Sequence, residues 1–243
     1  MSVTYLRFEL LRTFRNARFF IFSFAFPVIL YFVIAGPNKG ETNFGDTGIS
    51  APLYYMIGLA AFGAMMATIS SGARIAGERS VGWNRQLRIT PLSARSYLGA
   101  KVLTAYVMAT LSILLMYVCG SILGVRLGAG DWLAMTGLIL VGLVPFAALG
   151  VLIGHLLTVD AIGPVMGGTA SLLALLGGTW FPITSGFMYD LARLLPSYWL
   201  VRASHVSIGG GGWGAQGWIV IGAWSVVLSL LAMRAYRRDT KRV

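Results

Sequence analysis

The side chains that could do chemistry in this sequence are concentrated in one polar segment, residues 74–101. A single acid, Glu78, lies there among six of the nineteen Lys and Arg residues of the chain. A carboxylate among cations can form charge-assisted contacts, either to a partner protein or to a nearby Arg. Two hypotheses follow: the segment is a docking element, or it is a basic loop that only fixes membrane topology. Its basic residues are Arg74, Arg79, Arg85, Arg88, Arg95 and Lys101.

Motifs for catalysis and for nucleotide binding are missing from the sequence. It has no Gly-Lys dipeptide, and hence no P-loop, and it has no Gly-x-Ser-x-Gly. The two histidines, His155 and His205, are predicted to lie on opposite sides of a membrane, so they cannot share a metal ion. No acid is expected at mid-membrane, where ion-coupled carriers place one. We therefore expect no catalytic residue, metal or cofactor in this chain, and any energy for pumping should come from a partner.

The composition is that of a polytopic membrane protein. Of the 243 residues 57% are hydrophobic and 11% are charged, and the mean hydropathy is +0.76. Soluble domains carry about 25% charged residues. Membrane topology explains the net charge of +11, so no nucleic-acid partner is expected. Cys119 is the single cysteine and cannot form an intrachain disulfide. We predict one all-α membrane domain over residues 1–243.

Apolar runs predict six membrane-spanning helices. Residues 2–18, in which Leu6, Leu10 and Phe14 recur among four arginines, predict an amphipathic helix in the membrane interface. Pro145 should kink the fourth span. The predicted spans are residues 19–36, 52–73, 97–123, 132–157, 161–181 and 217–236.

The basic residues predict the orientation of these spans. With this topology fifteen Lys and Arg residues lie on one side: at the N-terminus, in residues 74–101 and from Arg234 onward. Only four lie on the other side, namely Lys39, Arg126, Arg193 and Arg202. The positive-inside rule then places both termini in the cytoplasm. We expect a multi-pass protein of a prokaryotic inner membrane.

The polar segment also has a predicted local structure. Residues 78–88 contain one glycine and no proline, which favours a short helix. Thr90 precedes Pro91, so the helix should end there. Ser93 can then cap a new helix that continues into the third span.

Two sequence patterns carry a family resemblance. The first pattern is E-R-x-x-G-x-x-x-x-L-x-x-T-P with a Lys further on, and the residues that match it are Glu78, Arg79, Gly82, Leu87, Thr90, Pro91 and Lys101. The second pattern is G-G-x-x-F-P followed by L-P-x-Y, and the residues that match it are Gly177, Gly178, Phe181, Pro182, Leu195, Pro196 and Tyr198. In this order the patterns resemble those of ABC-2 type permeases, the membrane subunits of a class of ATP-driven exporters. The chain departs from that family at Ser80, Val81 and Trp83, where many members have acids and a Thr.

The resemblance implies partners and a function. In the family the first segment, here with Arg85 and Arg88, is a coupling helix that docks on a separate ATP-binding-cassette ATPase subunit, which binds ATP and Mg. The second motif forms two short re-entrant helices on the outer side. Two permease copies, identical or paralogous, enclose the path. The implied cargo is a hydrophobic or amphiphilic small molecule, such as a drug, an antibiotic or a lipid-like product, and the implied process is efflux.

Two further sets of residues follow from spans 2 and 5. In the family these spans line the path, so its candidate lining here is Tyr55, Phe62, Met66 and Met166. The alternative is that these side chains only pack or face lipid. Small residues spaced four apart predict close helix packing in this chain or with a second copy. These are Gly63 with Ala67, and Gly163, Gly167 and Ser171.

Rival functions remain open at the level of the sequence. A membrane immunity or sensor protein would bind a ligand without transporting it. A self-contained carrier or a membrane enzyme would need no ATPase, but it would need the intramembrane acids or catalytic side chains that the sequence lacks. An adjacent reading frame for an ATPase with a P-loop would discriminate between these classes.

Overall fold

The computed structural model describes residues 3–83, 86, 89–90, 93–203 and 212–241, and every regular element in this part of the chain is a helix. The predicted all-α class is therefore confirmed. Five helices, two of them made of two segments, are long and apolar enough to cross a membrane. They are α4 (Ala51–Ala73) with α5 (Ile75–Ser80), α7 (Ala94–Ile122), α8 (Ala129–Gly142) with α9 (Val144–Leu156), α10 (Val159–Leu176) and α13 (Gly214–Lys241).

The first predicted span is a helix in three pieces: α2 (Ala17–Phe20), the π-helical η1 (Ile21–Ala25) and α3 (Phe26–Ala35). Pro27 explains the irregularity, because it has no N–H to donate to the carbonyl of Ser23 one turn earlier. The hydroxyl of Ser112 in α7 donates to that carbonyl at 3.1 Å instead. Only residues 23–35 of this run form an uninterrupted apolar helix, and that helix is shorter than the other five.

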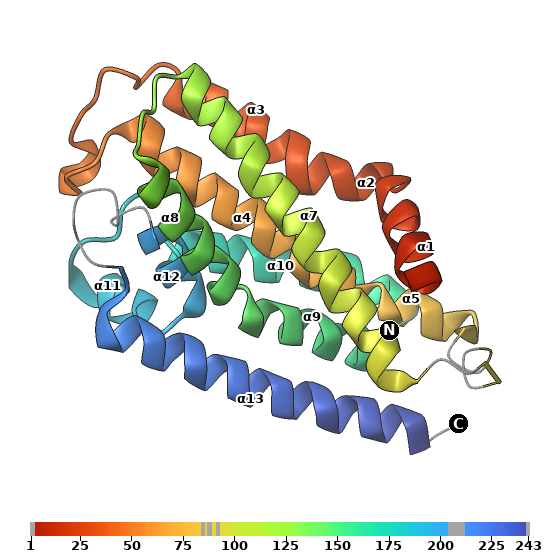
Figure 1. Cartoon of the computed structure of the whole chain (residues 1–243). Coiled ribbons are helices and arrows are strands. Elements are labelled where there is room, and N and C mark those ends of the chain that lie inside the picture. Colours follow the sequence, from red (N-terminus) through yellow and green to blue (C-terminus); the bar gives the residue numbers. More distant parts are fainter. Residues whose placement is uncertain (1–2, 84–85, 87–88, 91–92, 204–211, 242–243) are drawn as a thin grey trace.

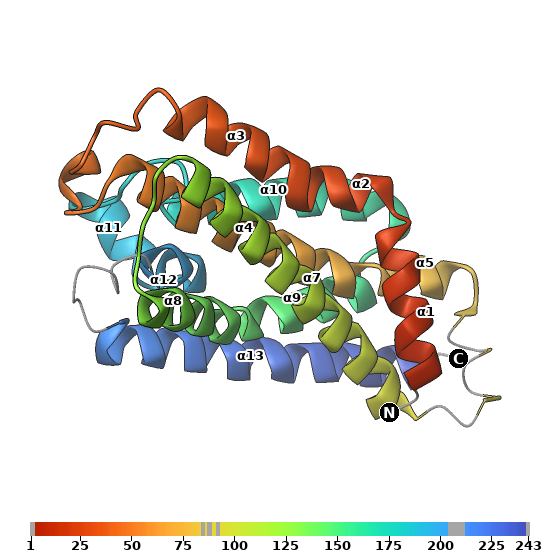
Figure 2. The same cartoon turned by 45° about the horizontal axis from the view of Figure 1, so that its top comes forward.

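The helix α4 lies inside the bundle, between α3, α7 and α9 (Figure 1, Figure 2). Every residue of α4 except Ser70 is buried. Glycines allow this enclosure: a Cβ on Gly72 would lie 2.8 Å from Cα of Gly150 in α9, and a Cβ on Gly150 would lie 2.6 Å from the Ile69 carbonyl oxygen. Small residues let two helix backbones approach this closely.

The two ends of the bundle differ in content. The N-terminal helix α1 (Val3–Phe14), α5 and both termini lie at one end (Figure 1, Figure 2). The short elements η2 (Phe44–Asp46), α11 (Gly186–Ala192) and α12 (Pro196–Arg202) lie at the other. Finding both termini at one end agrees with an even number of passages through the bundle.

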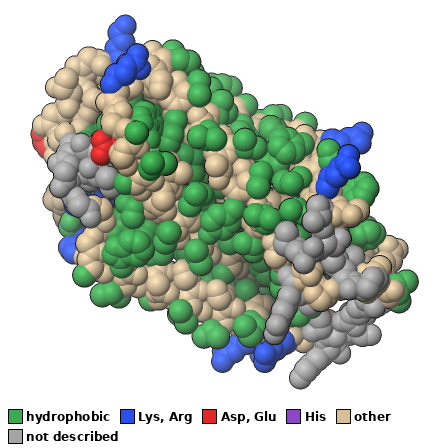
Figure 3. All heavy atoms as spheres, in the orientation of Figure 1, with side chains coloured by type: hydrophobic (Ala, Val, Ile, Leu, Met, Phe, Trp, Pro, Cys, Tyr) green, Lys and Arg blue, Asp and Glu red, His purple; other side chains and the backbone are tan. Residues whose placement is uncertain are grey.

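The outer surface of the bundle is apolar. In Figure 3 hydrophobic side chains cover the middle of one face, and Lys and Arg side chains lie at its periphery. Exposed Ile29, Leu172 and Ile219 belong to three different helices. An apolar surface of this extent would be unfavourable in water and is suited to a lipid bilayer.

Several predicted boundaries differ from the structure. The helix predicted over residues 78–88 overlaps α5 only in part: α5 continues α4 after a bend at Arg74 and ends at Ser80. Gly82, with φ +71°, follows in the left-handed region that favours glycine. Trp83 and Gln86 are helical again, and residues 84–85 and 87–88 lie outside the described residues. The helix predicted over residues 2–18 already ends at Phe14, and Asn16 accepts a hydrogen bond from the Phe19 N–H at the start of the next helix.

Other local predictions are confirmed. Ser93 caps α7, since its side chain accepts a hydrogen bond of 3.2 Å from the N–H of Ser96. The fourth predicted span is interrupted at Leu143, two residues before Pro145. The predicted end of the fifth span at residue 181, by contrast, is wrong: α10 ends at Leu176, and the chain turns at Gly178, which has φ +74°.

Candidate functional site

Glu78 of α5 lies at the centre of a buried ionic cluster. Its Oε1 atom is 2.5 Å from Nζ of Lys101 in α7 and 2.7 Å from a guanidinium nitrogen of Arg12 in α1. Its Oε2 atom accepts a hydrogen bond of 2.5 Å from the Tyr97 hydroxyl. Both carboxylate oxygens are thus occupied within the chain. The sequence left two kinds of contact open for Glu78, one with a partner protein and one with a nearby cation of the same chain. The geometry favours the contact with nearby cations.

Glu9 is the second carboxylate of this cluster and belongs to α1. Its Oε1 atom is 2.6 Å from Nζ of Lys101 and 3.4 Å from the guanidinium of Arg74. Arg74 also donates to the hydroxyl of Thr13, one turn after Glu9. The face of α1 that packs against the bundle is therefore polar. Its apolar side chains Phe8, Leu11 and Phe14 are exposed, which suits a helix at a lipid interface.

The cluster fixes α5 to α1 and α7. The side chains of Glu78 and Lys101 are both 1% exposed, so their charges are removed from water. A buried ion is tolerated when it is paired and hydrogen-bonded, and removing one partner costs about 3–5 kcal/mol. Burial first, and then the nearby Glu9 and Glu78, raise the pKa of Tyr5, so this phenol stays neutral beside the carboxylates.

Arg79 points away from that cluster. Its Nε atom is 2.8 Å from Oδ2 of Asp239 in α13, and its NH1 group donates to the Gly154 carbonyl in α9 at 3.2 Å. Glu78 and Arg79 are adjacent in sequence but connect α5 to different helices. The pair therefore joins four other helices at one end of the bundle.

The rest of the polar segment presents apolar side chains to the outside. Val81 is 73% exposed, Trp83 37% and Ile89 88%. Thr90 of the predicted motif is also exposed, and a Cβ on Gly82 would meet nothing within 4 Å. Four further residues of that motif, Arg85, Leu87, Arg88 and Pro91, lie outside the described residues.

The second sequence motif lies at the opposite end. The Gly178 carbonyl accepts a hydrogen bond from the Tyr54 hydroxyl of α4. Pro182 packs on η2, where a Cβ on Gly45 would lie 2.7 Å from its Cγ. Phe181 is half-exposed. The motif thus attaches the segment after α10 to the start of α4.

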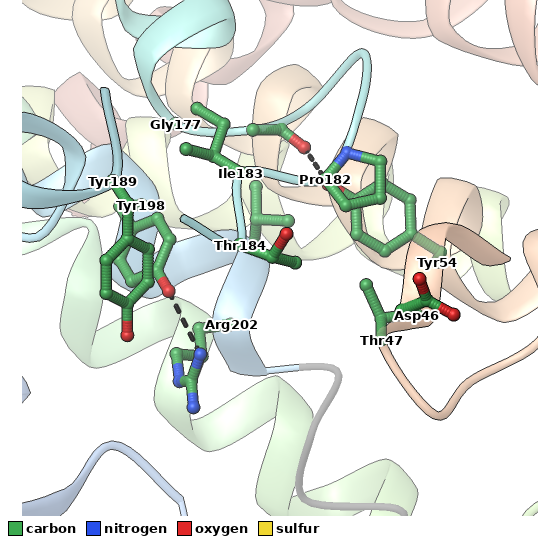
Figure 4. A pocket seen from close by; sticks show the side chains of 12 residues that line it. Asp46, Thr47, Tyr54, Gly177, Pro182, Ile183, Thr184, Tyr189, Tyr198 and Arg202 are labelled. Carbon is green, nitrogen blue, oxygen red and sulfur yellow. Dashed lines mark hydrogen bonds between the residues drawn. The ribbon is translucent and has the colours of Figure 1, made fainter. Parts of the chain in front are cut away.

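A cavity of about 280 Å³ lies beside this motif. In Figure 4, Tyr198 and Arg202 lie on one side of it and Asp46 on the other. Tyr198 is buried, and its hydroxyl accepts a hydrogen bond of 2.9 Å from Arg202. Pro196 is the first residue of α12, a position where its missing N–H leaves no hydrogen bond unmade.

The candidate path residues lie in the interior of the single chain. Tyr55, Phe62, Met66 and Met166 are all buried. Tyr55 donates to the Trp180 carbonyl at 3.0 Å, and the Phe62 ring lies 5.8 Å from the Trp180 ring. In this arrangement the four side chains pack between helices.

The two small-residue faces differ. Gly63 packs against neighbouring helices, and a Cβ there would lie 2.8 Å from the Ser23 carbonyl oxygen. Ala67 is fully buried beside Phe19. On α10, by contrast, a Cβ on Gly163 or Gly167 would meet nothing within 4 Å. Ser171 is likewise exposed, so this face has no neighbour among the described residues of the same chain.

Two residues of the ionic contacts were missed by sequence reasoning. Glu9 is the only acid among the N-terminal arginines, and Asp239 is the only acid in α13. Glu9 and Lys101 are 92 residues apart, so no spacing rule links them. No three His, Cys, Asp or Glu side chains of the described residues group together as metal ligands would.

Comparisons with known proteins agree with the sequence patterns. Residues 38–234 match a family described as "ABC-2 family transporter protein". The chain is also similar to a Bacillus subtilis (strain 168) protein named "Putative transport permease YvfS". The two are 31% identical over 236 residues, which cover 95% of each chain.

Proposed function

The chain belongs to the ABC-2 family of transport permeases, and from this we propose that it is the membrane-spanning subunit of an exporter driven by a separate ATPase. The partner ATPase binds ATP and Mg, and this chain supplies the membrane path. The observation that carries the proposal is the arrangement around α5. Glu78 and Arg79 join α5 to four other helices, while Val81, Trp83 and Ile89 beyond it are exposed.

This arrangement divides the polar segment into two parts with different tasks. Ion pairs attach α5 to α1, α7 and α13, and a hydrogen bond attaches it to α9, so displacement of α5 pulls on all four helices. The exposed apolar side chains form the docking surface for the ATPase, because apolar area gains most from being covered. The ATPase contact is thus made by Val81, Trp83 and Ile89, and the Glu78–Arg79 pair transmits the movement.

A charge on the docking surface should release the ATPase. Ile89→Asp is expected to weaken binding of the partner ATPase about tenfold or more, because burying one Ile side chain contributes about 1.5–3 kcal/mol. Binding is measured by titrating the purified permease in lipid nanodiscs with its candidate partner ATPase. Ser93→Asp is the matched control: it adds the same charge four residues away, and Asp is also a good helix N-cap. Equal affinity for Ile89→Asp and wild type would contradict the docking role.

The orientation proposed for the chain has six spans with both termini in the cytoplasm of a prokaryotic cell, in the inner membrane. The three-piece helix from Ala17 to Ala35 is the first span, and the end that holds the ionic cluster is cytoplasmic. The charge distribution supports this placement.

Thiol labelling tests that orientation. In a Cys119→Ala background, Thr42→Cys should react with a membrane-impermeant reagent in intact cells, and Ser93→Cys should react only after lysis. Both residues are exposed in the structure, so burial does not limit the reaction. Labelling of Ser93→Cys from outside intact cells would refute the topology.

The path is proposed to lie between two permease copies. The exposed small-residue face of α10 supports this, because Gly163, Gly167 and Ser171 offer a close-packing surface without a neighbour among the described residues of the chain. In the 18-residue apolar stretch of α10 only 11% is buried, whereas 89% of the corresponding stretch of α4 is buried. The proposed cargo is a hydrophobic or amphiphilic small molecule, such as a drug, an antibiotic or a lipid-like product, whose efflux would give resistance.

A further inference from the structure

Asp239 of α13 contacts side chains of two other helices, α5 and α9. Its Oδ2 atom is 2.8 Å from Nε of Arg79 in α5 and 3.0 Å from Nδ1 of His155 in α9. The His155 side chain is 2% exposed, and its ring meets the ring of Tyr236 in α13 edge-on at 5.4 Å. Arg79 also donates to the carbonyl of Gly154, the residue before His155. One carboxylate thus connects the ends of α5, α9 and α13.

An acid at this position is unfavourable for α13 taken alone. Asp239 lies in the last turn of a helix, where the backbone dipole leaves partial negative charge and favours cations. The other charged side chains at this end of α13 are basic: Arg234, Arg237, Arg238 and Lys241. The carboxylate nevertheless makes its close contacts with the neighbouring helices, through Arg79 and His155.

These contacts link α13 to α5. The backbone of α13 packs along α9 and, at its other end, against α12 (Figure 1). At the end where α5 lies, side chains connect the helices: Arg79 pairs with Asp239, and His155 of α9 contacts the same carboxylate. Loss of the carboxylate would leave Arg79 attached to Gly154 alone among these partners.

We propose that Asp239 is a positioning residue that holds the end of α13 to α5, so that the last span moves together with the segment that receives the ATPase. This deepens the proposed function and rests on it. Glu78 connects α5 to α1 and α7, and Asp239 adds the connection to α13. The last span is then displaced with α5 through one ion pair.

A distance measurement tests the contact without any ATPase. Spin labels on Ser80→Cys in α5 and Arg238→Cys in α13, in a Cys119→Ala background, report the separation of the two ends in lipid nanodiscs. Both sites are exposed. Wild type should give one narrow distance distribution, and Asp239→Ala should broaden it or shift it to longer distances. An unchanged distribution in Asp239→Ala would overturn the proposal.

Transport assays test the consequence in the reconstituted complex with its ATPase. Asp239→Ala should lower the cargo moved per ATP hydrolysed by about fivefold or more, the lower end of typical coupling effects. ATP hydrolysis should continue, the melting temperature should stay close to that of wild type, which a simple folding defect would not allow, and Asp239→Glu should restore part of the loss. Asp160→Asn, an exposed acid at the start of α10, is the matched control. An unchanged ratio in Asp239→Ala would refute the positioning role.

The two measurements separate the two proposals. A wild-type chain that binds no ATPase would refute the proposed function, whereas the spin-label distance still decides whether Asp239 holds α13 to α5.

Discussion

Replacing Glu78 with alanine should destabilise the protein by about 3–5 kcal/mol. The variant leaves Lys101 buried with one carboxylate instead of two, and Arg12 loses its partner. In detergent or nanodiscs we expect a melting temperature lower by on the order of 10 °C and a reduced yield of folded protein. Transport should fall further than the amount of folded protein, because Glu78 also links α5 to α1 and α7.

A double-mutant cycle identifies the interaction responsible. Glu78→Gln keeps the shape of the side chain and an acceptor for Tyr97 but removes the charge. Glu78→Gln combined with Lys101→Met should be less destabilised than the sum of the single variants, because the second change removes the buried cation that has lost one of its two carboxylates. Glu41→Ala, at an exposed acid of the opposite end, should leave the melting temperature unchanged. Wild-type stability of Glu78→Ala combined with loss of ATPase binding would instead place Glu78 at the partner.

Adding a single methyl group at Gly72 should separate two helices of the bundle. In Gly72→Ala the new Cβ would lie 2.5 Å from the Val151 nitrogen and 2.8 Å from Cα of Gly150, both backbone atoms of α9. Backbone cannot rotate away as a side chain can, so α9 must shift. Overpacking costs about 1–3 kcal/mol and occasionally more, which exceeds the gain of about 1 kcal/mol in helix propensity. We expect a clearly lower melting temperature for Gly72→Ala and failure to fold for Gly72→Leu.

The same substitution on α10 serves as the control. A Cβ on Gly167 would meet nothing within 4 Å, so Gly167→Ala should melt like wild type. Gly167→Leu should also fold, and a loss of dimers from that variant would support the proposed second copy. If Gly72→Ala melted like Gly167→Ala, the close crossing of α4 and α9 would be wrong.

Local features of the fold could be predicted from the sequence. Apolar runs located the long helices, Ser93 predicted the start of α7, and Pro145 predicted the interruption of the fourth span. Each depends on residues within one or two turns of each other. The first span was predicted over residues 19–36, which include Pro27, but the hydrogen bond with which Ser112 of another helix compensates for that proline could not be predicted.

The candidate site was predictable only in part. The Glu78–Arg79 pair was found by its pattern, but its contacts were not, because they lie in α1, α7, α9 and α13. The polar face of α1 left one sign: Glu9 and Thr13 are four residues apart and so share a helix face. The arginines between and around these two residues made that polar face difficult to recognise in the sequence. Asp239 was difficult to recognise for the same reason, because it lies among the basic residues of a terminal helix.

The enclosure of α4 also constrains how the protein can be made. Chains are synthesised at about 5–20 residues per second, so α9 follows α4 out of the ribosome only after several seconds. Until then, the face of α4 that α9 will cover, with Gly72 and its neighbours, has no partner in the chain. A helix lined with small residues offers such a face to any other helix in the bilayer. Biogenesis of this protein therefore includes an interval in which its central helix must be shielded from wrong partners, by the insertion machinery or by surrounding lipid.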